Sequence, residues 1–420
     1  MPALYDTATG LYHSGIRCAA AFNAKARRWR DGRRGLWQRL EQHAPALQGC
    51  LWMHCASVGE FEQGRPVLEA IKAQRPNLPV LLTFFSPSGY EARRNEPLAT
   101  HVDYLPPDSA ANAERLIRLV RPRAAVFVKY EFWYHHLHAL RRGGVPTLLV
   151  SAIFRPGQPF FRWYGSAWRR MLACFTQIHV QDDRSAALLA PLALPDVCVS
   201  GDTRFDRVAA IARTTEELPI AAAFRGEGPA LVCGSTWPDD EKLLLGALPA
   251  VHAPVKLFVV PHELGEAQLA DIEARFPKPL ARWSELEGAP ADNVRALLGS
   301  GRTGTLLVDR MGLLARLYRH GDLAYVGGGF GDGIHSLLEA AAWGRPVIFG
   351  PRHTKFAEAQ GLIDAGGGSE VRNAHDLSDV LQRLLNDPAS LAVASAAARG
   401  YVQGRTGATE RVVRGLLPYC

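Results

Sequence analysis

The strongest structural signal in this chain lies in residues 51–64, which read LWMHCASVGEFEQG. The first half is an apolar run with a single histidine, which predicts a buried parallel strand, and the second half turns through Ser57 and Gly59 into a helical pattern. Glu60 is therefore expected at the carboxyl end of a strand and in the first turn of a helix. Ligands of open α/β sheets bind at that edge, so Glu60 is a candidate functional carboxylate. The alternative is that it only complements the positive end of the helix.

The β-α alternation continues on both sides of a weakly patterned stretch. Up to residue 200, strand patterns lie at 79–85, 102–105, 124–129, 146–151 and 176–181, and helical patterns near 61–74, 109–120, 131–142 and 161–173. A second series has strands at 230–233, 255–260, 305–308, 323–326, 346–349 and 369–371, with helices near 239–249, 264–275, 311–319, 335–343, 355–365 and 375–386. This repetition predicts two doubly wound, Rossmann-like α/β domains with a cleft between them.

The domain boundaries follow from where the periodicity changes. We expect a basic amphipathic segment over 1–40, an α/β domain over 41–206, a linker over 207–229, a second α/β domain over 230–400 and a C-terminal helix over 401–420 that could pack back on the first domain. The linker is indicated by weak periodicity and by threonine, proline and glycine punctuation.

Composition limits the compartment and the partners. The chain has 420 residues, a formal charge of +7 and a pI near 9.1, which favours an anionic partner: a nucleic acid, a phosphorylated substrate or an acidic membrane surface. Its seven cysteines are scattered without C-x-x-C spacing, which indicates a reducing compartment and neither a zinc site nor a disulfide framework. No window is long and apolar enough for a transmembrane helix, and no signal peptide is evident.

The N-terminal 40 residues combine an apolar patch with a cationic stretch. The apolar positions lie between Leu11 and Phe22, and the cations between Lys25 and Arg34 surround Trp29. Such a segment could lie in the headgroup region of an anionic membrane. The alternative is a basic helix that folds on its own domain, with its cations in solvent.

A glycine-rich loop in the second domain is the clearest phosphate-binding signal. Residues 327–333 read GGGFGDG after a predicted strand, and a helix is expected from Ile334. Glycines let backbone amides approach a phosphate, and a helix N-terminus adds partial positive charge. Glu339, one turn into that helix, could accept hydrogen bonds from ribose hydroxyls. A tight turn after a strand uses the same glycines, but the downstream glutamate favours a nucleotide-sugar site.

Six segments, in this order, resemble the 3-deoxy-D-manno-octulosonic acid (Kdo) transferases of lipopolysaccharide synthesis: residues 57–60, 129–133, 201–206, 260–262, 309–312 and 327–339. The resemblance runs from about residue 10 to about residue 400. It implies a GT-B fold, CMP-Kdo as donor bound by the C-terminal domain, and a lipid A precursor (lipid IVA) as acceptor bound by the N-terminal domain. It also implies inversion at the transferred carbon, peripheral attachment to the anionic cytoplasmic face of the inner membrane, and no cofactor or metal.

The resemblance also implies roles for individual residues. Glu60 would be the base that takes the proton of the attacking hydroxyl, Glu131 would stabilise the transition state, and Arg204 would stand where the family usually has a lysine. The donor would contact Pro261, His262, Met311, Gly312, Leu313, Gly328, Gly329, Ser336, Leu337, Leu338 and Glu339. Of these, His262 replaces an arginine, Leu313 an acidic residue and Ser336 an asparagine.

Three other features permit more than one interpretation. The cluster His135, His136 and His138 lacks further ligands at metal spacing. Residues 83–89 either line an acceptor pocket or simply cap a helix. Aromatics and arginines interleave over 154–170, which suits the phosphates and acyl chains of a lipid acceptor, and no nucleic-acid module accompanies them. Rival functions are a UDP-sugar 2-epimerase-like isomerase and an inactive, membrane-associated GT-B protein.

Overall fold

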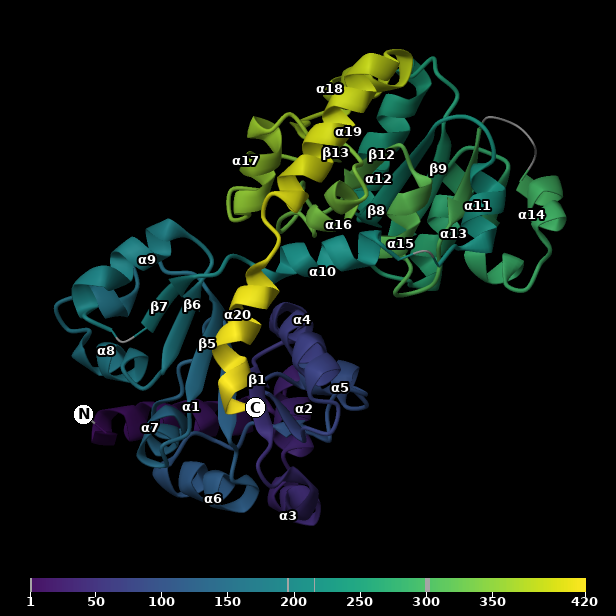
Figure 1. The fold of residues 1–420 in the computed structure, drawn as a ribbon. Coiled ribbons are helices and arrows are strands. Elements are labelled where there is room, and N and C mark those ends of the chain that lie inside the picture. Colours follow the sequence, from purple (N-terminus) through teal and green to yellow (C-terminus); the bar gives the residue numbers. More distant parts are fainter. Residues whose placement is uncertain (1, 195, 215, 299–302) are drawn as a thin grey trace. The chain divides into compact units, whose positions relative to one another are not determined.

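The computed structural model describes residues 2–194, 196–214, 216–298 and 303–420. The chain forms two compact units, one of Met1–Arg207 with Thr406–Cys420 and one of Val208–Arg405, which are described separately (Figure 1). Each unit contains one seven-stranded sheet in which every pairing is parallel. The predicted α/β class is therefore confirmed for both halves of the chain.

The sheet of the first unit has the strand order β3-β2-β1-β4-β5-β6-β7. Its strands are β1 (Leu51–Cys55), β2 (Val80–Phe84), β3 (His101–Tyr104), β4 (Ala124–Val128), β5 (Thr147–Ala152), β6 (Gln177–Val180) and β7 (Asp196–Val199). The central strands are buried along their whole length because helices cover both faces. Alternate residues enter different cores: Trp52 packs in one, and Leu51 and Met53 pack in the other.

The helices of the first unit divide between those two cores. They are α1 (Pro2–Ala19), α2 (Ala24–Gly32), α3 (Leu36–Leu47), α4 (Val58–Gln74), α5 (Pro87–Arg93), α6 (Ala110–Val120), α7 (Tyr134–Arg142), α8 (Ser166–Leu172), α9 (Asp183–Leu189) and α20 (Ala408–Leu416). Helices α3, α6, α7, α8 and α9 supply one core, and α4 and α20 supply the other. The C-terminal helix α20 packs on α4, with Val412 and Leu416 fully buried.

The N-terminal segment is anchored to the first unit through polar contacts. The hydroxyl of Tyr5 in α1 donates to Oδ2 of Asp108 at 2.6 Å, and Asp6 pairs with His135 at the start of α7. The guanidinium of Arg33 lies 3.9 Å from the ring centre of Trp29 and donates to the carbonyl of Phe85 at 2.8 Å. Arg33 is therefore part of the packing between α2 and the sheet. Its burial there lowers the pKa of the guanidinium to about 9.

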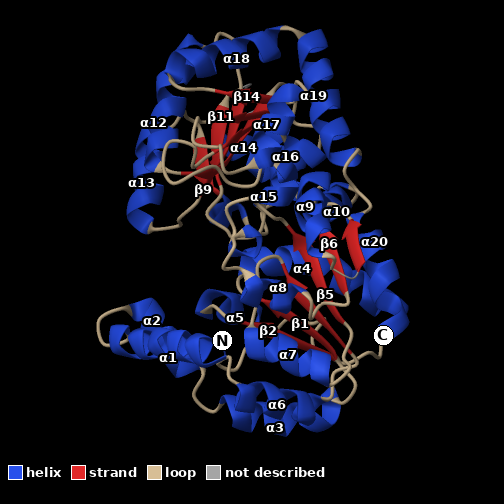
Figure 2. Ribbon diagram, turned by 90° about the vertical axis from the view of Figure 1, so that its left-hand side faces the viewer, coloured by secondary structure: helices blue, strands red, loops and turns tan. Residues whose placement is uncertain are grey.

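The sheet of the second unit has the order β10-β11-β9-β8-β12-β13-β14 (Figure 2, strands in red). Its strands are β8 (Ala230–Thr236), β9 (Lys256–Pro261), β10 (Leu280–Arg282), β11 (Gly304–Leu307), β12 (Leu323–Val326), β13 (Val347–Phe349) and β14 (Gly368–Glu370). Its helices are α11 (Pro219–Arg225), α12 (Pro238–Ala247), α13 (Glu266–Arg275), α14 (Ala291–Leu298), α15 (Leu314–Leu317), α16 (Leu338–Ala342), α17 (Ala357–Asp364), α18 (Ala374–Asn386) and α19 (Pro388–Gln403).

The structure differs from the sequence-based expectations at several places, including the following four. Strands β7 and β10 were not predicted, because they are short edge strands with a weak apolar signal. The expected linker at 207–229 contains the end of α10 (Thr203–Ala212) and the whole of α11, in which Ile220, Ala221, Ala223 and Phe224 are buried. The helix expected from Ile334 begins at Leu338, since the preceding loop folds back on itself through Gly328 and Gly333.

Candidate active site

The candidate catalytic residues lie where the strand order of the first sheet reverses. From β1 the chain proceeds outward through β2 and β3, and then returns to place β4 on the other side of β1. Glu60 is in the first turn of α4, directly after β1, and Glu131 is in the loop after β4. The carboxyl ends of these neighbouring parallel strands form the crevice in which open α/β sheets bind ligands.

Glu60 is both a helix-capping residue and a titratable one. Its Oε2 accepts the backbone N–H of Ser57 at 3.0 Å, so the helix-complementing interpretation holds. The side chain is half-buried, and burial followed by the negative charge of Glu131 raises the pKa of the Glu60 carboxyl above its ordinary value. A carboxylate whose pKa is raised in this way is a better proton acceptor than a solvated glutamate.

Glu131 is held by two donors from different elements. Its Oε2 accepts from the indole N–H of Trp133 at 2.7 Å and lies 2.9 Å from Nε2 of the buried His54 on β1. Nδ1 of His54 lies 2.9 Å from the hydroxyl of Thr83, which in turn accepts from the indole of Trp52 at 2.9 Å. One proton arrangement satisfies all of these groups: Thr83 donates to Nδ1, and Nε2–H donates to Glu131. Thr83, considered above for an acceptor pocket, is thus a buried member of this network.

The backbone is constrained next to these groups. Lys129, the residue after β4, has φ +69, and Ser151 near the end of β5 has φ +52. Both lie in the left-handed region of backbone conformation, which residues other than glycine seldom occupy. The hydroxyl of Ser151 lies 3.0 Å from that of Thr203, which donates to the carbonyl of Gln63 on α4. Uncommon conformations of this kind concentrate at functional sites.

Arg204 lies at the start of α10, in a segment that is tied down by its own carboxylates. Its Nε donates to Oδ2 of Asp202 at 2.8 Å, which fixes the direction of the guanidinium and offsets part of its charge. Asp206 accepts the backbone N–H groups of Gly407 and Thr409, each at 2.6 Å, and so caps α20. The two aspartates of the 201–206 segment therefore have structural functions.

In the second unit, the glycine-rich loop follows β12, which pairs with β8, the first strand of this sheet in the sequence. A Cβ on Gly327 would come within 2.3 Å of the carbonyl of Ser235, and one on Gly329 within 2.6 Å of the backbone of Gly350. Close backbone packing therefore requires these glycines, as the tight-turn interpretation held. The buried carboxylate of Asp240 accepts the N–H groups of Gly328 at 2.9 Å and Trp237 at 3.0 Å, which joins this loop to the start of α12.

A pocket of about 340 Å³ lies at this switch point. It is lined by Trp237, Pro238, Asp239, Asp240, Gly328, Gly331, Asp332, Gly333 and His335. The His262 ring stacks on the rings of both Trp237 and His335, with centroid distances of 4.6 and 4.4 Å, and the Trp237 indole donates to Nε2 of His335. Rings with exposed faces suit a planar base or sugar ring.

The predicted donor residues separate into three groups. Gly328 lines the pocket, Pro261 ends β9, and the exposed His262 borders the pocket through its stacked ring. Met311, Gly312 and Leu313 lie in the loop between β11 and α15, where Met311 is 79% exposed. Gly329, Ser336, Leu337, Leu338 and Glu339 belong to the loop after β12 or to the first turn of α16; Leu337 and Leu338 are buried, and the Glu339 charge acts on the buried Tyr318.

Three residues at this pocket, Trp237, Asp240 and His335, were not predicted from the sequence as site residues. The available signal for Trp237 and Asp240 was the polar run GSTWPDD at residues 234–240, where β8 ends. His335 lies within the 327–339 segment.

Metal chemistry finds no support in the histidine cluster. His135 pairs with Asp6 and His136 with Asp108, and these contacts fasten α7 to α1 and to the loop before α6. Within the ranges that the structure describes, no three His, Cys, Asp or Glu side chains converge in a way that could hold a metal ion. Among the helices described, none has the length and apolar character needed to cross a membrane.

Two doubly wound parallel sheets, each with polar groups at its switch point, define a GT-B-like fold. In agreement, the chain is similar in structure to UDP-GlcNAc 2-epimerase from Neisseria meningitidis (TM-score 0.60, 15% identity, 88% of this chain and 99% of that one). It is also similar to MurG from Acinetobacter baumannii (TM-score 0.55, 14% identity, 88% and 99%). At these identities the likeness concerns the fold alone.

Sequence comparison specifies the family. The family model described as 3-deoxy-D-manno-octulosonic-acid transferase (kdotransferase) matches residues 28–207. The 3-deoxy-D-manno-octulosonic acid transferase of Bordetella pertussis is 30% identical to this chain, and the alignment covers 92% of this chain and 94% of the relative. That of Aquifex aeolicus is 29% identical over 81% and 87%. The chain belongs to the Kdo transferase family of glycosyltransferases.

Proposed function

We propose that this chain transfers Kdo from CMP-Kdo to a lipid A precursor, lipid IVA, with inversion at the transferred carbon. The oxygen of an acceptor hydroxyl attacks the anomeric carbon of Kdo, and the bond from that carbon to the phosphate oxygen of CMP breaks. The hydroxyl proton goes to Glu60, and CMP leaves with the bonding electron pair. No metal or cofactor takes part in the proposed reaction.

The observation that carries this proposal is the pair of carboxylates at the switch point of the first sheet. Burial and, after it, the negative charge of Glu131 raise the pKa of the Glu60 carboxyl. A base with a raised pKa is what direct displacement by a sugar hydroxyl requires. Membership of the Kdo transferase family supports the same assignment.

The remaining residues are assigned by the resemblance to the family. Glu131, fixed by Trp133 and His54, stabilises the transition state, and Arg204 offsets negative charge on the donor's carboxylate or on the leaving phosphate. The second unit binds the CMP moiety through the residues predicted above and through Trp237 and His335. Asp240 positions the glycine loop for the phosphate.

The acceptor and the location are part of the same proposal. We assign the first unit to the lipid acceptor and the protein to the cytoplasmic face of the inner membrane, attached peripherally. The support is that the first unit exposes Leu11 and Phe22 in its N-terminal segment, and exposes Trp163 and Tyr164 next in sequence to the exposed Arg162. Aromatic and cationic side chains together favour an anionic membrane surface.

The test is incubation of the purified protein with CTP, Kdo, a CMP-Kdo-forming activity and lipid IVA, with mass analysis of the lipid product. We expect a mass increase of one or more Kdo units, and NMR of the new linkage should show inversion. Glu60→Gln should lose transfer while still binding CMP, whereas Glu62→Gln, a matched loss of a carboxylate on the same helix, should remain active. Unaltered lipid IVA with the parent protein, or full activity of Glu60→Gln, would refute the proposal.

A further inference from the structure

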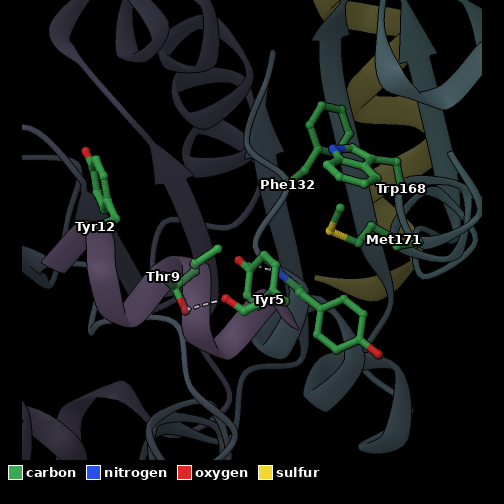
Figure 3. Close-up of a pocket in the computed structure, with 9 residues that line it drawn as sticks. Tyr5, Thr9, Tyr12, Phe132, Trp168 and Met171 are labelled. Carbon is green, nitrogen blue, oxygen red and sulfur yellow. Dashed lines mark hydrogen bonds between the residues drawn. The ribbon is translucent and has the colours of Figure 1, made fainter. Parts of the chain in front are cut away.

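The first unit contains an apolar cavity outside the catalytic network. It has a volume of about 410 Å³, within the roughly 300–1,000 Å³ typical of ligand pockets. Figure 3 shows its lining, which comes from α1, from the loop after β4, from the start of α7 and from α8. The lining residues are Tyr5, Ala8, Thr9, Tyr12, Phe132, Tyr134, Ala167, Trp168 and Met171.

Two hydroxyls of this lining, those of Tyr5 and Thr9, are already engaged in hydrogen bonds. The Tyr5 hydroxyl donates to Asp108 and accepts the N–H of Tyr134 at 3.3 Å. The Thr9 hydroxyl donates to the backbone carbonyl of Tyr5 at 2.9 Å (Figure 3). Rings, methyl groups and a thioether therefore make up most of the surface that the cavity presents to its contents. Such a surface favours a hydrocarbon over a sugar, whose hydroxyls would lose hydrogen bonds there.

The surroundings of the cavity indicate which hydrocarbon would enter it. Phe132 in its wall is the direct neighbour of Glu131 in the sequence, so one loop contributes both to the cavity and to the candidate catalytic site. Tyr12 and Trp168 are 52% and 38% exposed, which leaves aromatic rings at the solvent side of the lining. The exposed Arg170 lies on the same helix as Trp168. An apolar interior with aromatic rings at its solvent side matches an acyl chain whose polar head stays in water.

We propose that this cavity binds one acyl chain of the lipid acceptor and thereby orients the acceptor toward Glu60. The inference rests on the proposed function for the identity of the acceptor. It adds a specific subsite, formed by α1 and α8, through which the enzyme would recognise the hydrocarbon part of that substrate. Burial of methylene groups in the cavity would favour acceptors with long chains.

The first test fills the cavity. Ala167→Phe on α8 and, separately, Ala8→Phe on α1 place a ring in the space, and Ala19→Phe, at an exposed position of α1 outside the lining, is the matched control. We expect the filled variants to raise KM for lipid IVA about tenfold with kcat nearly unchanged, since about two methylenes of contact would be lost. With lipid IVA stripped of its acyl chains, parent and variants should react alike. Equal effects on both acceptors, or no effect on either, would overturn the inference.

The second test does not depend on turnover. An acceptor analogue with brominated acyl chains should quench the fluorescence of Trp168. We therefore expect quenching in the parent protein, and loss of this quenching in Trp168→Phe and in Ala167→Phe. Quenching by brominated phospholipid vesicles alone, undiminished by added acceptor, would assign the cavity to bulk membrane lipid and overturn the inference. A parent protein that transfers Kdo but shows no Trp168 quenching would overturn it and leave the proposed function intact. Quenching without transfer would refute only the function.

Discussion

Nε2 of His54 lies 2.9 Å from Oε2 of Glu131, and this contact joins strand β1 to the loop after β4 across the switch point of the first sheet. His54 is fully buried, and Glu131 is only 8% exposed. An ionised carboxylate at such a position requires donors, and His54 and Trp133 supply them. His54 is therefore a positioning residue that fixes the orientation of Glu131.

His54→Ala should lower kcat about 30-fold, equivalent to about 2 kcal/mol for a lost hydrogen bond to a charged group. The donor KM should change little, because the network lies in the first unit. Steady-state kinetics with varied CMP-Kdo would measure both constants, and His138→Ala on α7, outside this network, is the control. A variant that loses only melting temperature and retains kcat would show that His54 is merely structural.

Two substitutions at Glu60 should separate its two functions. Glu60→Gln retains an oxygen that can accept the Ser57 N–H, whereas Glu60→Ala removes the cap. Both should lose about 10²- to 10⁴-fold in kcat with the loss of the base, but only Glu60→Ala should lose about 1 kcal/mol of stability. Rates and denaturant unfolding would be measured side by side. Equal destabilisation by both substitutions would contradict the capping assignment.

The pH dependence of transfer should report the environment of Glu60. A base must be ionised to act, and burial together with the Glu131 charge raises its pKa, so kcat/KM should begin to fall at a pH above the ordinary range of glutamate as the solution is acidified. Glu131→Gln removes the neighbouring charge and should move this acid limb to lower pH in the residual activity. A limb that stays in place or moves upward would mean that another group is titrating.

Asp240→Asn tests how the donor loop of the second unit is held. An amide cannot accept the N–H groups of Gly328 and Trp237 and the Tyr325 hydroxyl as the carboxylate does. We expect about a tenfold weaker affinity for CMP, measured by calorimetry, as one net hydrogen bond is lost. Asp292 on α14 is exposed and lies outside the pocket lining, and Asp292→Asn should leave CMP affinity unchanged. If both variants bind CMP like the parent, the loop is held by other contacts.

Asp108 should govern the attachment of α1. Burial opposes ionisation of its carboxyl, but hydrogen bonds from His136 and Tyr5 outweigh it and lower the pKa to about 2. A lowered pKa contributes stability above the ordinary aspartate range, and this contribution is lost as the pH falls toward 2. Asp108→Asn should therefore cost about 2 kcal/mol at pH 7 in denaturant unfolding and expose α1 to proteolysis. Asp6→Asn, at the exposed partner of His135, should cost under about 1 kcal/mol.

Much of the fold could be predicted because its signals are local. The apolar runs at 51–55 and 124–128 are buried strands, and Ser57 to Glu60 begins a helix as expected. The failures share a cause: β7 and β10 are edge strands with little apolar content, and the 327–337 loop resembles a helix start only in composition. There, backbone contacts to Gly350 and Ser235 decide the conformation.

The sequence by itself determined the alternation of strands and helices and the position of Glu60 after β1, because burial patterns and turn residues act within a few positions along the chain. Only the tertiary structure decided that β4 pairs with β1, which brings His54 to Glu131, residues 77 positions apart. It alone also placed α1 beside α8 to enclose the apolar cavity. Strand order and helix docking depend on contacts between distant segments, and local periodicity carries no record of which distant partner a segment meets.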